Sequence, residues 1–368
     1  MKVLHLVSSG GLFGAERVIL TLAGSRCGFE SVVGALHNRH NPHLEIIGEA
    51  DRLGLPKAVF DSGGRFDGGA VSRVRHFLRD NGIDVIHTHN YKSDIIGFFA
   101  AKGAGKKWVA TNHVWHSTDQ KLRLYERMDA FALKFADKVV AVSDEIKRDL
   151  LSKGFTDNGV WVIHNGIDVS EFQQSFPVER LRGEWGWTME NIVFSIIGRL
   201  APEKGHEIFL KAAVEVLRDF KGARFLIVGD GPLRETLEAR VQDLGLSGAV
   251  AFTGIRKDMP AVYALSDVLV NSSSIEGLPM TILEAMASKL AIIATKVGAV
   301  PQVIRDQANG LLIEPGDPAV LAGAMRELAG QGETRRRLAQ HAFEDVCARF
   351  SARHMAEQYQ RVYQEVLG

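Results

Sequence analysis

The feature that most constrains this chain is a regular alternation of short β-branched runs with longer segments of helical period. In the first half the strand candidates are residues 3–7, 31–36, 58–60, 84–87, 107–111 and 138–142. In the second half they are residues 192–197, 224–228, 250–252, 268–270, 291–294 and 310–313. Strands that alternate with helices build βαβ units, so the pattern predicts an α/β fold with largely parallel sheets covered on both faces.

Length and one weakly patterned segment divide the chain into two domains. Its 368 residues exceed the usual size of a single hydrophobic core. Residues 165–191 contain Gly166, Pro177, Gly183 and Gly186 without a sustained period, and we expect the interdomain linker there. Each half opens with a strand that runs into a glycine turn. We therefore predict two Rossmann-like domains that face a cleft, with ligands at the carboxyl ends of the strands.

Composition and charge exclude several classes of protein. Hydrophobic residues make up 46% and charged residues 24%, which is ordinary for a globular chain and excludes extensive disorder. The 44 basic and 44 acidic side chains cancel, so no global field recruits nucleic acid. Cys27 and Cys347 indicate no disulfide framework or cysteine-based zinc site, and residues 1–7 are too short an apolar run for a signal peptide. We expect a cytoplasmic protein.

Basic residues nevertheless gather in one part of the first half. They are Lys102, Lys106, Lys107, Lys121, Arg123, Arg127, Lys134 and Lys138. One interpretation is a solvated helix face. The other is contact with an anionic acceptor or with the inner face of a membrane, to which the protein would bind peripherally. Both interpretations stay open at this point.

The first candidate binding motif directly follows the first strand. Residues 8–16 read Ser-Ser-Gly-Gly-Leu-Phe-Gly-Ala-Glu. Glycines let main-chain amides approach a ligand closely, and the next helix directs its positive end at the turn, so a phosphate or diphosphate is the natural guest. The spacing is not the G-x-G-x-x-G fingerprint of dinucleotide-binding proteins, and a tight strand–helix turn without a ligand is the alternative.

The second candidate motif occupies the same place in the second half. Residues 198–205 read Gly-Arg-Leu-Ala-Pro-Glu-Lys-Gly. Arg199 offers a planar fork of donors and Lys204 a mobile point charge, and both suit a doubly charged diphosphate. If a helix begins near Glu207, Lys204 lies at its positive end, which strengthens the attraction for an anion. Two surface cations in a loop are the alternative.

The third candidate motif is the most specific. Residues 276–287 read Glu-Gly-Leu-Pro-Met-Thr-Ile-Leu-Glu-Ala-Met-Ala and follow a strand and a polar turn. Glu276 precedes the helix that opens at Thr281, and Glu284 lies about one turn inside it. Carboxylates accept hydrogen bonds more strongly than neutral oxygens do, so these two are suited to hold neighbouring sets of hydroxyls, as on a sugar and a ribose. Two ordinary helix-surface glutamates are the alternative.

Together these motifs resemble those of the family 4 retaining glycosyltransferases, which have the GT-B fold, and the resemblance covers nearly the whole chain. The family's E-x7-E element matches Glu276 and Glu284, and its G-R-x-x-x-x-K-G element matches Arg199 and Lys204. Further similar segments are residues 162–168, 227–232 and 297–301, the last being the family's G-G-x-P with Ala299 in place of one glycine.

The resemblance implies a domain organisation. The first Rossmann-like domain, on the acceptor side, would comprise residues 1–168, and the second, which binds the donor, residues 169–350. Residues 351–368 read as an amphipathic helix. In relatives of this family the C-terminal segment crosses back onto the first domain, and we expect the same of this helix.

The resemblance also implies which residues bind the donor diphosphate and ribose. Arg199 and Lys204 would hold the diphosphate, helped by the main-chain amides of Gly11 and Gly14. Glu284 would bind the ribose hydroxyls. Because these contacts come from both halves, closure of the two domains on the donor is expected as well.

The hexose and the base have implied contacts of their own. Glu276 would hold the transferred hexose together with the main-chain amides of Gly277, Leu278 and Pro279. The donor-binding set continues through the helix start, at Met280 and Thr281. The base would lie near Gly229 and the loop that contains Ile255 and Arg256, and it would be contacted largely through the main chain.

Histidines supply the last candidates. His113 matches a histidine that in relatives lies beside the transferred sugar, with a structural histidine after a strand as the alternative. His5, His87, His89 and His116 are expected to be structural or on the acceptor side. No carboxylate–histidine set accompanies them, and no D-x-D motif occurs, so we expect no metal and no cofactor.

The implied reaction is retaining transfer of a hexose from a UDP- or GDP-linked donor to an acceptor hydroxyl. The cations would offset the charge that grows on the leaving diphosphate, and the leaving phosphate would itself accept the acceptor's proton. The acceptor would be a glycan or a lipid-linked sugar in the synthesis of a cell-envelope glycan or exopolysaccharide.

Two other functions remain as alternatives. A nucleotide-sugar epimerase shares the GT-B shape but lacks the arrangement of Glu276 and Glu284. A non-catalytic subunit that binds a nucleotide or carbohydrate would have the same binding residues but would catalyse no reaction. Hydrolysis of the donor without acceptor would separate an enzyme from such a binder. Nothing in the sequence indicates the oligomeric state.

Overall fold

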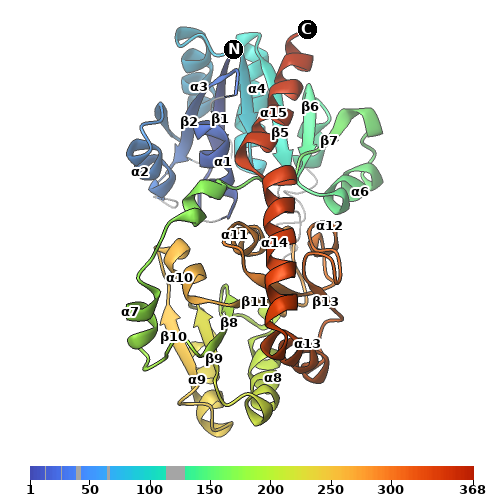
Figure 1. Ribbon diagram of the computed structural model, residues 1–368. Coiled ribbons are helices and arrows are strands. Elements are labelled where there is room, and N and C mark those ends of the chain that lie inside the picture. Colours follow the sequence, from blue (N-terminus) through green and yellow to red (C-terminus); the bar gives the residue numbers. More distant parts are fainter. Residues whose placement is uncertain (13, 26, 39–42, 64–66, 113–128) are drawn as a thin grey trace. The chain divides into compact units, whose positions relative to one another are not determined.

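The protein is described by a computed structural model that places residues 1–12, 14–25, 27–38, 43–63, 67–112 and 129–368. These residues form two compact units, Met1–Gly166 with Ala352–Gly368, and Ile167–Ser351. The sequence placed the boundary at residue 168, and in the structure it lies slightly earlier. Each unit is an α/β domain built on a parallel sheet, as the strand–helix alternation predicts (Figure 1).

The first unit contains a seven-stranded sheet in the order β3-β2-β1-β4-β5-β6-β7. Its strands are β1 (Lys2–Val7), β2 (Glu30–His37), β3 (Lys57–Asp61), β4 (Val85–Thr88), β5 (Lys107–Asn112), β6 (Lys138–Ala141) and β7 (Val160–Val162). Neighbouring strands all pair in parallel. The sequence predicts six of them. It misses β7 because three residues, Val-Trp-Val, are too few to show a strand pattern.

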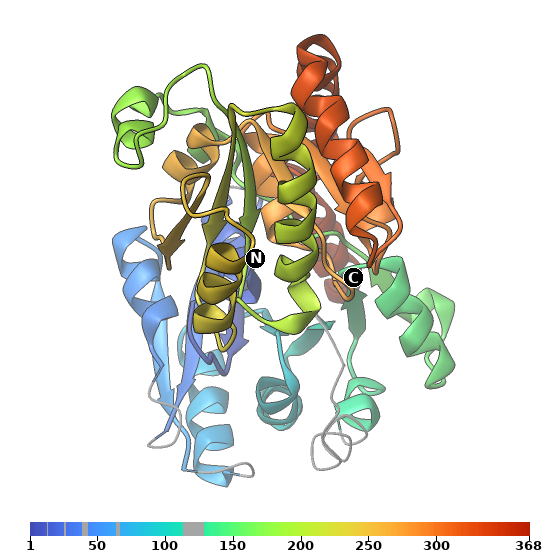
Figure 2. The ribbon, with the colours of Figure 1, turned by 90° about the horizontal axis from the view of Figure 1, so that it is seen from below.

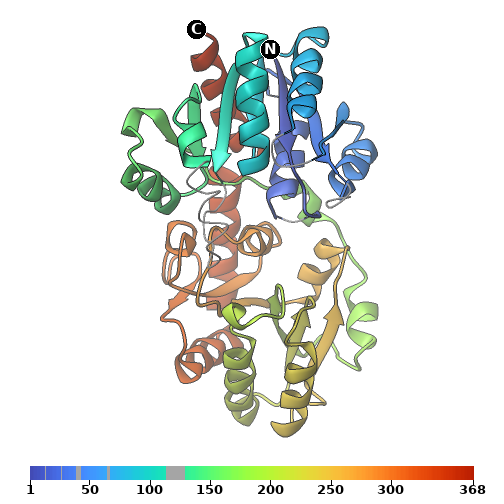
Figure 3. The same cartoon turned by 180° about the vertical axis from the view of Figure 1, so that it is seen from behind.

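Helices cover both faces of this sheet. Side chains of α3 (Gly68–Asp80), α4 (Tyr91–Ala104) and α6 (Asp144–Ser152) share one hydrophobic core with the strands, and those of α1 (Gly14–Gly24) and α2 (Glu45–Arg52) share another. Figure 3 shows α3 and α4 in front of the sheet. Helix α4 begins at a capping box in which Asn90 and Ser93 satisfy each other's main-chain amides.

The last helix, α15 (Ala352–Leu367), packs against α1 and β5 of the first unit. Its buried residues are Met355, Ala356, Tyr359, Val362, Tyr363 and Val366. The hydroxyl of Tyr363 lies 2.7 Å from Nδ1 of His87, and that of Tyr359 lies 3.0 Å from Oγ1 of Thr111. The predicted amphipathic helix and its return to the first domain are confirmed.

The second unit contains a six-stranded parallel sheet in the order β10-β9-β8-β11-β12-β13. Its strands are β8 (Ile192–Ile197), β9 (Ala223–Val228), β10 (Val250–Gly254), β11 (Val268–Asn271), β12 (Ala291–Thr295) and β13 (Leu311–Ile313). All six coincide with predicted runs, because buried parallel strands read as short continuous β-branched segments.

Helices also cover both faces of the second sheet. One core holds side chains of α8 (His206–Asp219), α9 (Arg234–Asp243) and α13 (Pro318–Gly330); the other holds those of α10 (Met259–Leu265), α11 (Met280–Ala287) and α12 (Val300–Val303). The long helix α14 (Gly332–Arg349) contributes to both cores. Figure 2 shows α8 and α9 side by side. Within the described ranges, no helix combines the length and the apolarity needed to cross a membrane.

The boundary between the two units lies inside the predicted linker segment, between Gly166 and Ile167. Residues 167–191 all belong to the second unit and include a 3-10 helix η2 (Val169–Gln173) and helix α7 (Val178–Gly183). Phe172 and Trp187 are buried in its core, and Arg182 is buried beside Asp267 at 3.0 Å. These helices are too short to show a helical period, which is why the sequence suggested a loop.

The two sheets share one topology, and that topology positions the candidate site. In each, the chain runs outward from the first strand to one edge and then returns to build the other side, so the direction reverses between β1 and β4 and between β8 and β11. Loops that leave adjacent strands in opposite directions open a crevice at the carboxyl end of the sheet. The loops after β8 and β11 carry the second and third sequence motifs.

Two buried carboxyl groups, Asp94 of α4 and Asp129, give the first testable prediction. Burial and the neighbouring Asp129 raise the pKa of Asp94 well above its usual value. The folded chain therefore keeps a proton that the unfolded chain releases near pH 4, so stability falls as the pH rises from there toward the raised pKa. In Asp94→Asn we expect a flatter pH dependence and a higher urea midpoint at neutral pH. The exposed Asp80→Asn on α3 is the control, and equal pH profiles for wild type and Asp94→Asn would contradict the pairing.

Candidate active site

The loops that follow β8 and β11 are tied together at the switch point of the second sheet. Oγ of Ser272 donates to the main-chain oxygens of Lys204 or Gly205, at 3.2 and 3.1 Å. Gly205 has φ of 72°, and a Cβ there would overlap the carbonyl oxygen of Ser272. This position therefore requires glycine both for its left-handed backbone and for the close approach of the second loop. The contact fixes the second motif against the third.

Glu276 is held by three donors on one of its oxygens. Nζ of Lys204, Oγ of Ser273 and Nδ2 of Asn271 all donate to Oε1, at 2.6, 2.6 and 3.2 Å. The side chain is 8% exposed. Within the described parts of the chain, Oε2 accepts no hydrogen bond. The carboxylate is thus fixed through one oxygen while the other stays available for a hydroxyl donor.

The two cations of the second motif differ in their surroundings. Lys204, in the 3-10 turn before α8, gives one of its three N–H donors to Glu276, which leaves two for an anion. Arg199 is exposed, and no described residue accepts a hydrogen bond from its guanidinium. His206, two residues after Lys204, is neutral at pH 7, since burial and then the charge of Lys204 lower its pKa to about 4.

Glu284 is a buried residue rather than a helix-surface one. It lies in α11, is 6% exposed, and its Oε2 accepts a 2.6 Å hydrogen bond from the hydroxyl of Tyr263 on α10. The same hydroxyl lies 3.3 Å from the main-chain oxygen of Thr281. Tyr263 therefore orients Glu284 and joins α10 to α11.

The loop between Glu276 and α11 has fewer main-chain N–H groups that could bind a sugar than the sequence predicts. Pro279 has no N–H, so the predicted hydrogen bond from its amide is wrong on chemical grounds. Gly277 and Leu278 retain theirs, and Met280 and Thr281 form the first turn of α11, where amides have no acceptor within the helix. The helix begins at Met280, one residue before the predicted start.

Gly298, in the segment of residues 297–301 that resembles the family's G-G-x-P, packs against the loop of Glu276. Its φ is 53°, and a Cβ there would overlap the carbonyl oxygen of Glu276. The amide of Ala299 donates to the carbonyl oxygen of Gly277 at 3.2 Å. Gly298 therefore sets how closely the turn after β12 approaches the loop of Glu276.

The residues expected near the base lie at the ends of adjacent strands. Gly229 has φ of 129°, packs against Gly198, and donates its amide to the carbonyl oxygen of Gly254 at 2.9 Å. Ile255 is 76% exposed, although most isoleucine side chains are buried. Arg256 is bound to Asp258 through two hydrogen bonds of 2.8 and 2.6 Å.

The glycine turn of the first unit is largely occupied by its own contacts. Oγ of Ser9 lies 3.2 Å from the amide of Gly11 and 3.0 Å from Oε1 of Glu16. Gly11 thus already has an acceptor for the amide that the resemblance assigned to the diphosphate. Gly14 is the first residue of α1, where an amide has no acceptor within the helix.

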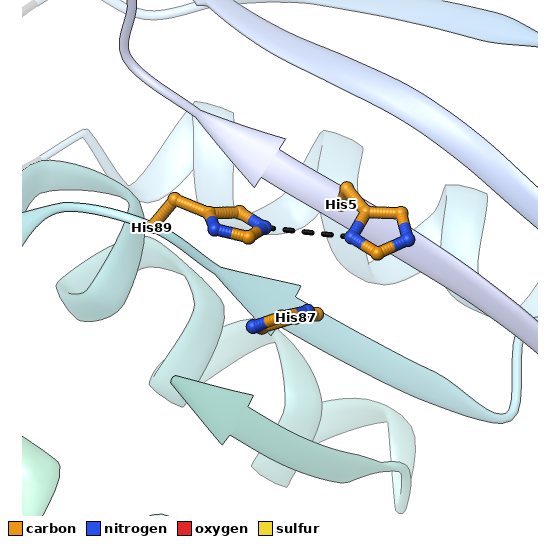
Figure 4. A group of neighbouring side chains, drawn as sticks. All are labelled: His5, His87 and His89. Atoms are coloured by element: carbon orange, nitrogen blue, oxygen red, sulfur yellow. Dashed lines mark hydrogen bonds between the residues drawn. The ribbon is translucent and has the colours of Figure 1, made fainter. Parts of the chain in front are cut away.

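Three histidines of the first unit lie together at the carboxyl ends of β1 and β4 (Figure 4). One ring nitrogen from each of His5, His87 and His89 lies within 4.8 Å of the others. His87 is already bonded at both nitrogens, to Tyr363 and Thr111 at 2.7 Å. Burial lowers the pKa of His5 to about 3. His87 therefore joins α15 to the sheet.

Some predicted residues are not brought together, and some contributors were missed. Lys204 and Glu276 are in direct contact, whereas Arg199 lies on the loop of Lys204 and Glu284 lies in α11. His113 and His116 lie outside the described residues.

Sequence reasoning overlooked Tyr263, Gly298 and the roles of Asn271 and Ser273 in holding Glu276. The polar turn before Glu276 was the only local signal for the last two.

Comparison with known proteins extends this picture. The chain is 31% identical over 250 residues to the UDP-Gal:α-D-GlcNAc-diphosphoundecaprenol α-1,3-galactosyltransferase of Escherichia coli, and the match spans 65% of each chain, slightly less than two thirds. It is 26% identical over 309 residues to the N-acetyl-α-D-glucosaminyl L-malate synthase of Bacillus anthracis, over 82% of this chain and 80% of that one.

A solved structure has the same fold. Anabaena HepE, crystallised in complex with UDP, superposes with a TM-score of 0.87 at 24% identity, over 99% of this chain and all of the other. HepE is a GT-B protein with two parallel-sheet α/β domains, and this chain shares that fold.

Family models account for nearly all of the sequence. The model for glycosyltransferase family 4 matches residues 14–171, and that for group 1 glycosyl transferases matches residues 177–345. The first covers most of the first unit and the second covers the loops that carry Arg199, Lys204, Glu276 and Glu284. The chain therefore belongs to the group 1 glycosyltransferases of family 4.

Proposed function

We propose that this chain is a retaining glycosyltransferase that moves a hexose from a UDP-linked donor to a hydroxyl of a glycan or lipid-linked acceptor. The observation that carries the proposal is the 2.6 Å ion pair of Lys204 with Glu276, which places a cation beside a carboxylate at the switch point of the donor-side sheet. The E. coli relative is named for a UDP sugar and a diphosphoundecaprenol-linked acceptor, which favours these substrates. GDP-linked donors are the alternative.

Arg199 and Lys204 would stabilise the departing diphosphate. Cleavage of the sugar–phosphate bond concentrates negative charge on the leaving group, so cations aimed at it lower the barrier. Lys204 has two N–H donors beyond the one given to Glu276, and Arg199 has a guanidinium without a partner in the described chain. The first amides of α8 and its dipole add to the same attraction.

Glu276 and Glu284 would bind hydroxyls on the two sugars of the donor. Glu276 presents Oε2 while three donors fix Oε1, so it is suited to accept from the hexose without moving. Glu284, oriented by Tyr263, would accept from the ribose. Because the Glu276 carboxylate is committed to hydroxyl binding, it is not assigned as a covalent nucleophile.

Retention of configuration would follow from same-face displacement. The acceptor oxygen attacks the anomeric carbon from the side on which the diphosphate leaves, and a phosphate oxygen takes the acceptor's proton. His113 would orient the hexose. The charge that a metal would otherwise offset is met by Arg199 and Lys204, so the reaction needs neither metal nor cofactor. The acceptor would belong to a cell-envelope glycan or exopolysaccharide, with the enzyme in the cytoplasm or at the inner face of the membrane.

Thermal-shift measurements test the donor assignment. At 100 times its dissociation constant, a UDP-hexose is expected to stabilise the fold by about 2.7 kcal/mol, with the same shift in EDTA because no metal is required. GDP-hexoses are the matched control for the base. A shift with GDP sugars alone would overturn the choice of uridine, and loss of the shift in EDTA would overturn metal independence. Release of UDP without acceptor would distinguish an enzyme from a silent binder.

A further inference from the structure

Four phenylalanines of the first unit form a continuous row on its surface. Phe99 of α4 is 52% exposed, and Phe131 and Phe135, which precede β6, are 66% and 56% exposed. Ring centroids lie 4.9 Å apart for Phe98–Phe99, 5.5 Å for Phe98–Phe135 and 5.3 Å for Phe131–Phe135. We call Phe98, Phe99, Phe131 and Phe135 the aromatic row. Contiguous exposed apolar surface of this kind marks an interaction site, because burying it is favourable.

The aromatic row is rooted in the core of the first unit. The ring of Phe98 lies 5.6 Å from that of the buried Trp108 and packs against the core shared by α3 and α4. Helix α4 is fixed at both ends, by the Asn90 capping box and by Gly105 in the left-handed conformation. Phe98 and Phe99 therefore stand on a rigid helix.

Basic side chains lie on the elements that carry the row and on the neighbouring α3. Lys102 of α4 lies 5.8 Å over the ring of Phe98, Arg79 of α3 donates to the main-chain oxygen of Gly103, and Lys134 is exposed between Phe131 and Phe135 in sequence. We call Arg79, Lys102, Lys106 and Lys134 the basic rim. It retains part of the cluster seen in the sequence.

Nearby acids neutralise little of the basic rim. Asp137 ion-pairs with Lys107 at 3.0 Å, outside the rim, and Asp94 is buried. Asp80, at the end of α3, is exposed. Three basic residues of the predicted cluster lie outside the described residues: Lys121, Arg123 and Arg127.

We propose that the aromatic row and basic rim dock the protein onto an anionic phospholipid bilayer. Phenylalanine rings lower their free energy at the boundary between headgroups and acyl chains, and lysine and arginine bind the lipid phosphates. A hydrophobic protein partner would be met by the rings alone and a duplex nucleic acid by the cations alone, whereas the bilayer surface uses both. The choice also rests on the proposed function, since a lipid-linked acceptor is held in a membrane.

Co-sedimentation with vesicles tests the proposal without any donor or acceptor. The wild type is expected to bind vesicles of phosphatidylglycerol and phosphatidylcholine in equal parts, and to bind phosphatidylcholine alone much more weakly. The triple variant Phe99→Ser/Phe131→Ser/Phe135→Ser should lose at least about tenfold in partition coefficient, and so should Lys102→Glu/Lys134→Glu.

Matched control variants come from other surfaces of the chain. Leu53→Ser/Val59→Ser removes exposed apolar side chains elsewhere in the first unit, and Lys211→Glu/Lys221→Glu makes the same change of charge in the second. Both are expected to bind vesicles like the wild type. Wild-type protein that ignores anionic vesicles, or row variants that bind them unchanged, would overturn the proposal. The proposal would also be overturned if substitutions in the aromatic row changed the oligomeric state in size-exclusion chromatography, because the row would then be an interface between copies of the chain.

Two further readouts keep the outcomes separable. In Phe131→Trp, brominated lipids should quench fluorescence beyond the quenching of the native tryptophans, a result that does not depend on the triple variant folding. The thermal shift with UDP-hexose should be the same in row variants and wild type. If the wild type fails to bind vesicles but keeps its thermal shift with UDP-hexose, the docking surface is refuted and the transferase assignment stands. If it binds vesicles but shows no thermal shift with UDP-hexose, the donor assignment is refuted and the docking surface stands.

Discussion

Replacing Lys204 by alanine is expected to lower kcat/KM about 10²- to 10³-fold, equivalent to about 2.7–4 kcal/mol of transition-state stabilisation. The ammonium lies at the start of α8, and two of its donors are free to follow the charge that develops on the leaving diphosphate. The loss should fall mainly on kcat, because that charge is greatest after the sugar–phosphate bond has stretched. Steady-state release of UDP measures it.

Stability and charge controls isolate this effect. Without Lys204, Glu276 still accepts hydrogen bonds from Ser273 and Asn271, but its buried carboxylate loses its counter-ion, so the melting temperature should fall and rates are compared at a temperature where the variant is folded. Lys211→Ala, on the exposed side of the same helix, removes an identical charge and should keep wild-type turnover. Full activity in Lys204→Ala and in Arg199→Ala together would refute the assignment of the diphosphate site.

The parts of the fold that the sequence predicts are those fixed by local chemistry. Of the thirteen strands in the described residues, twelve appear as short β-branched runs bounded by polar or glycine residues, and their alternation with helices leaves few topologies open. The switch points then follow from the strand order, so that the loops after β8 and β11 had to meet. For this reason the contact of Lys204 with Glu276, 72 residues apart, was predictable in kind from two motifs.

The parts that escaped prediction depend on contacts between residues distant in sequence. Tyr263 reaches Glu284 from another helix, and nothing local to either residue signals that bond. Ser9 lies within the first glycine motif, yet only the folded turn shows that it engages the amide of Gly11. The aromatic row also needed the fold, because Phe135 becomes a neighbour of Phe98 only when α4 and the segment before β6 pack together.

Gly298→Ala is expected to reduce kcat/KM about 100-fold although the residue offers no functional group, because displacing a site by about 1 Å costs this much. The added Cβ would overlap the carbonyl oxygen of Glu276, and the neighbour is main chain, which cannot rotate away as a flexible side chain would. The loop of Glu276 must therefore shift, and its carboxylate leaves the position set by Lys204, Ser273 and Asn271. The affinity for UDP-hexose should fall with the rate, since the same loop precedes α11.

Gly245→Ala is the matched control for the stability lost when alanine takes a left-handed backbone conformation. Gly245 has φ of 68°, close to the 53° of Gly298, but a Cβ there has no atom within 4 Å. Both variants bear the left-handed penalty of about 1–2 kcal/mol in stability, whereas only Gly298→Ala meets the loop of Glu276. We expect Gly245→Ala to melt earlier and to turn over normally at temperatures where it is folded. Equal activity in the two variants would show that the loop of Glu276 tolerates displacement, and that its rigid placement does not govern the reaction.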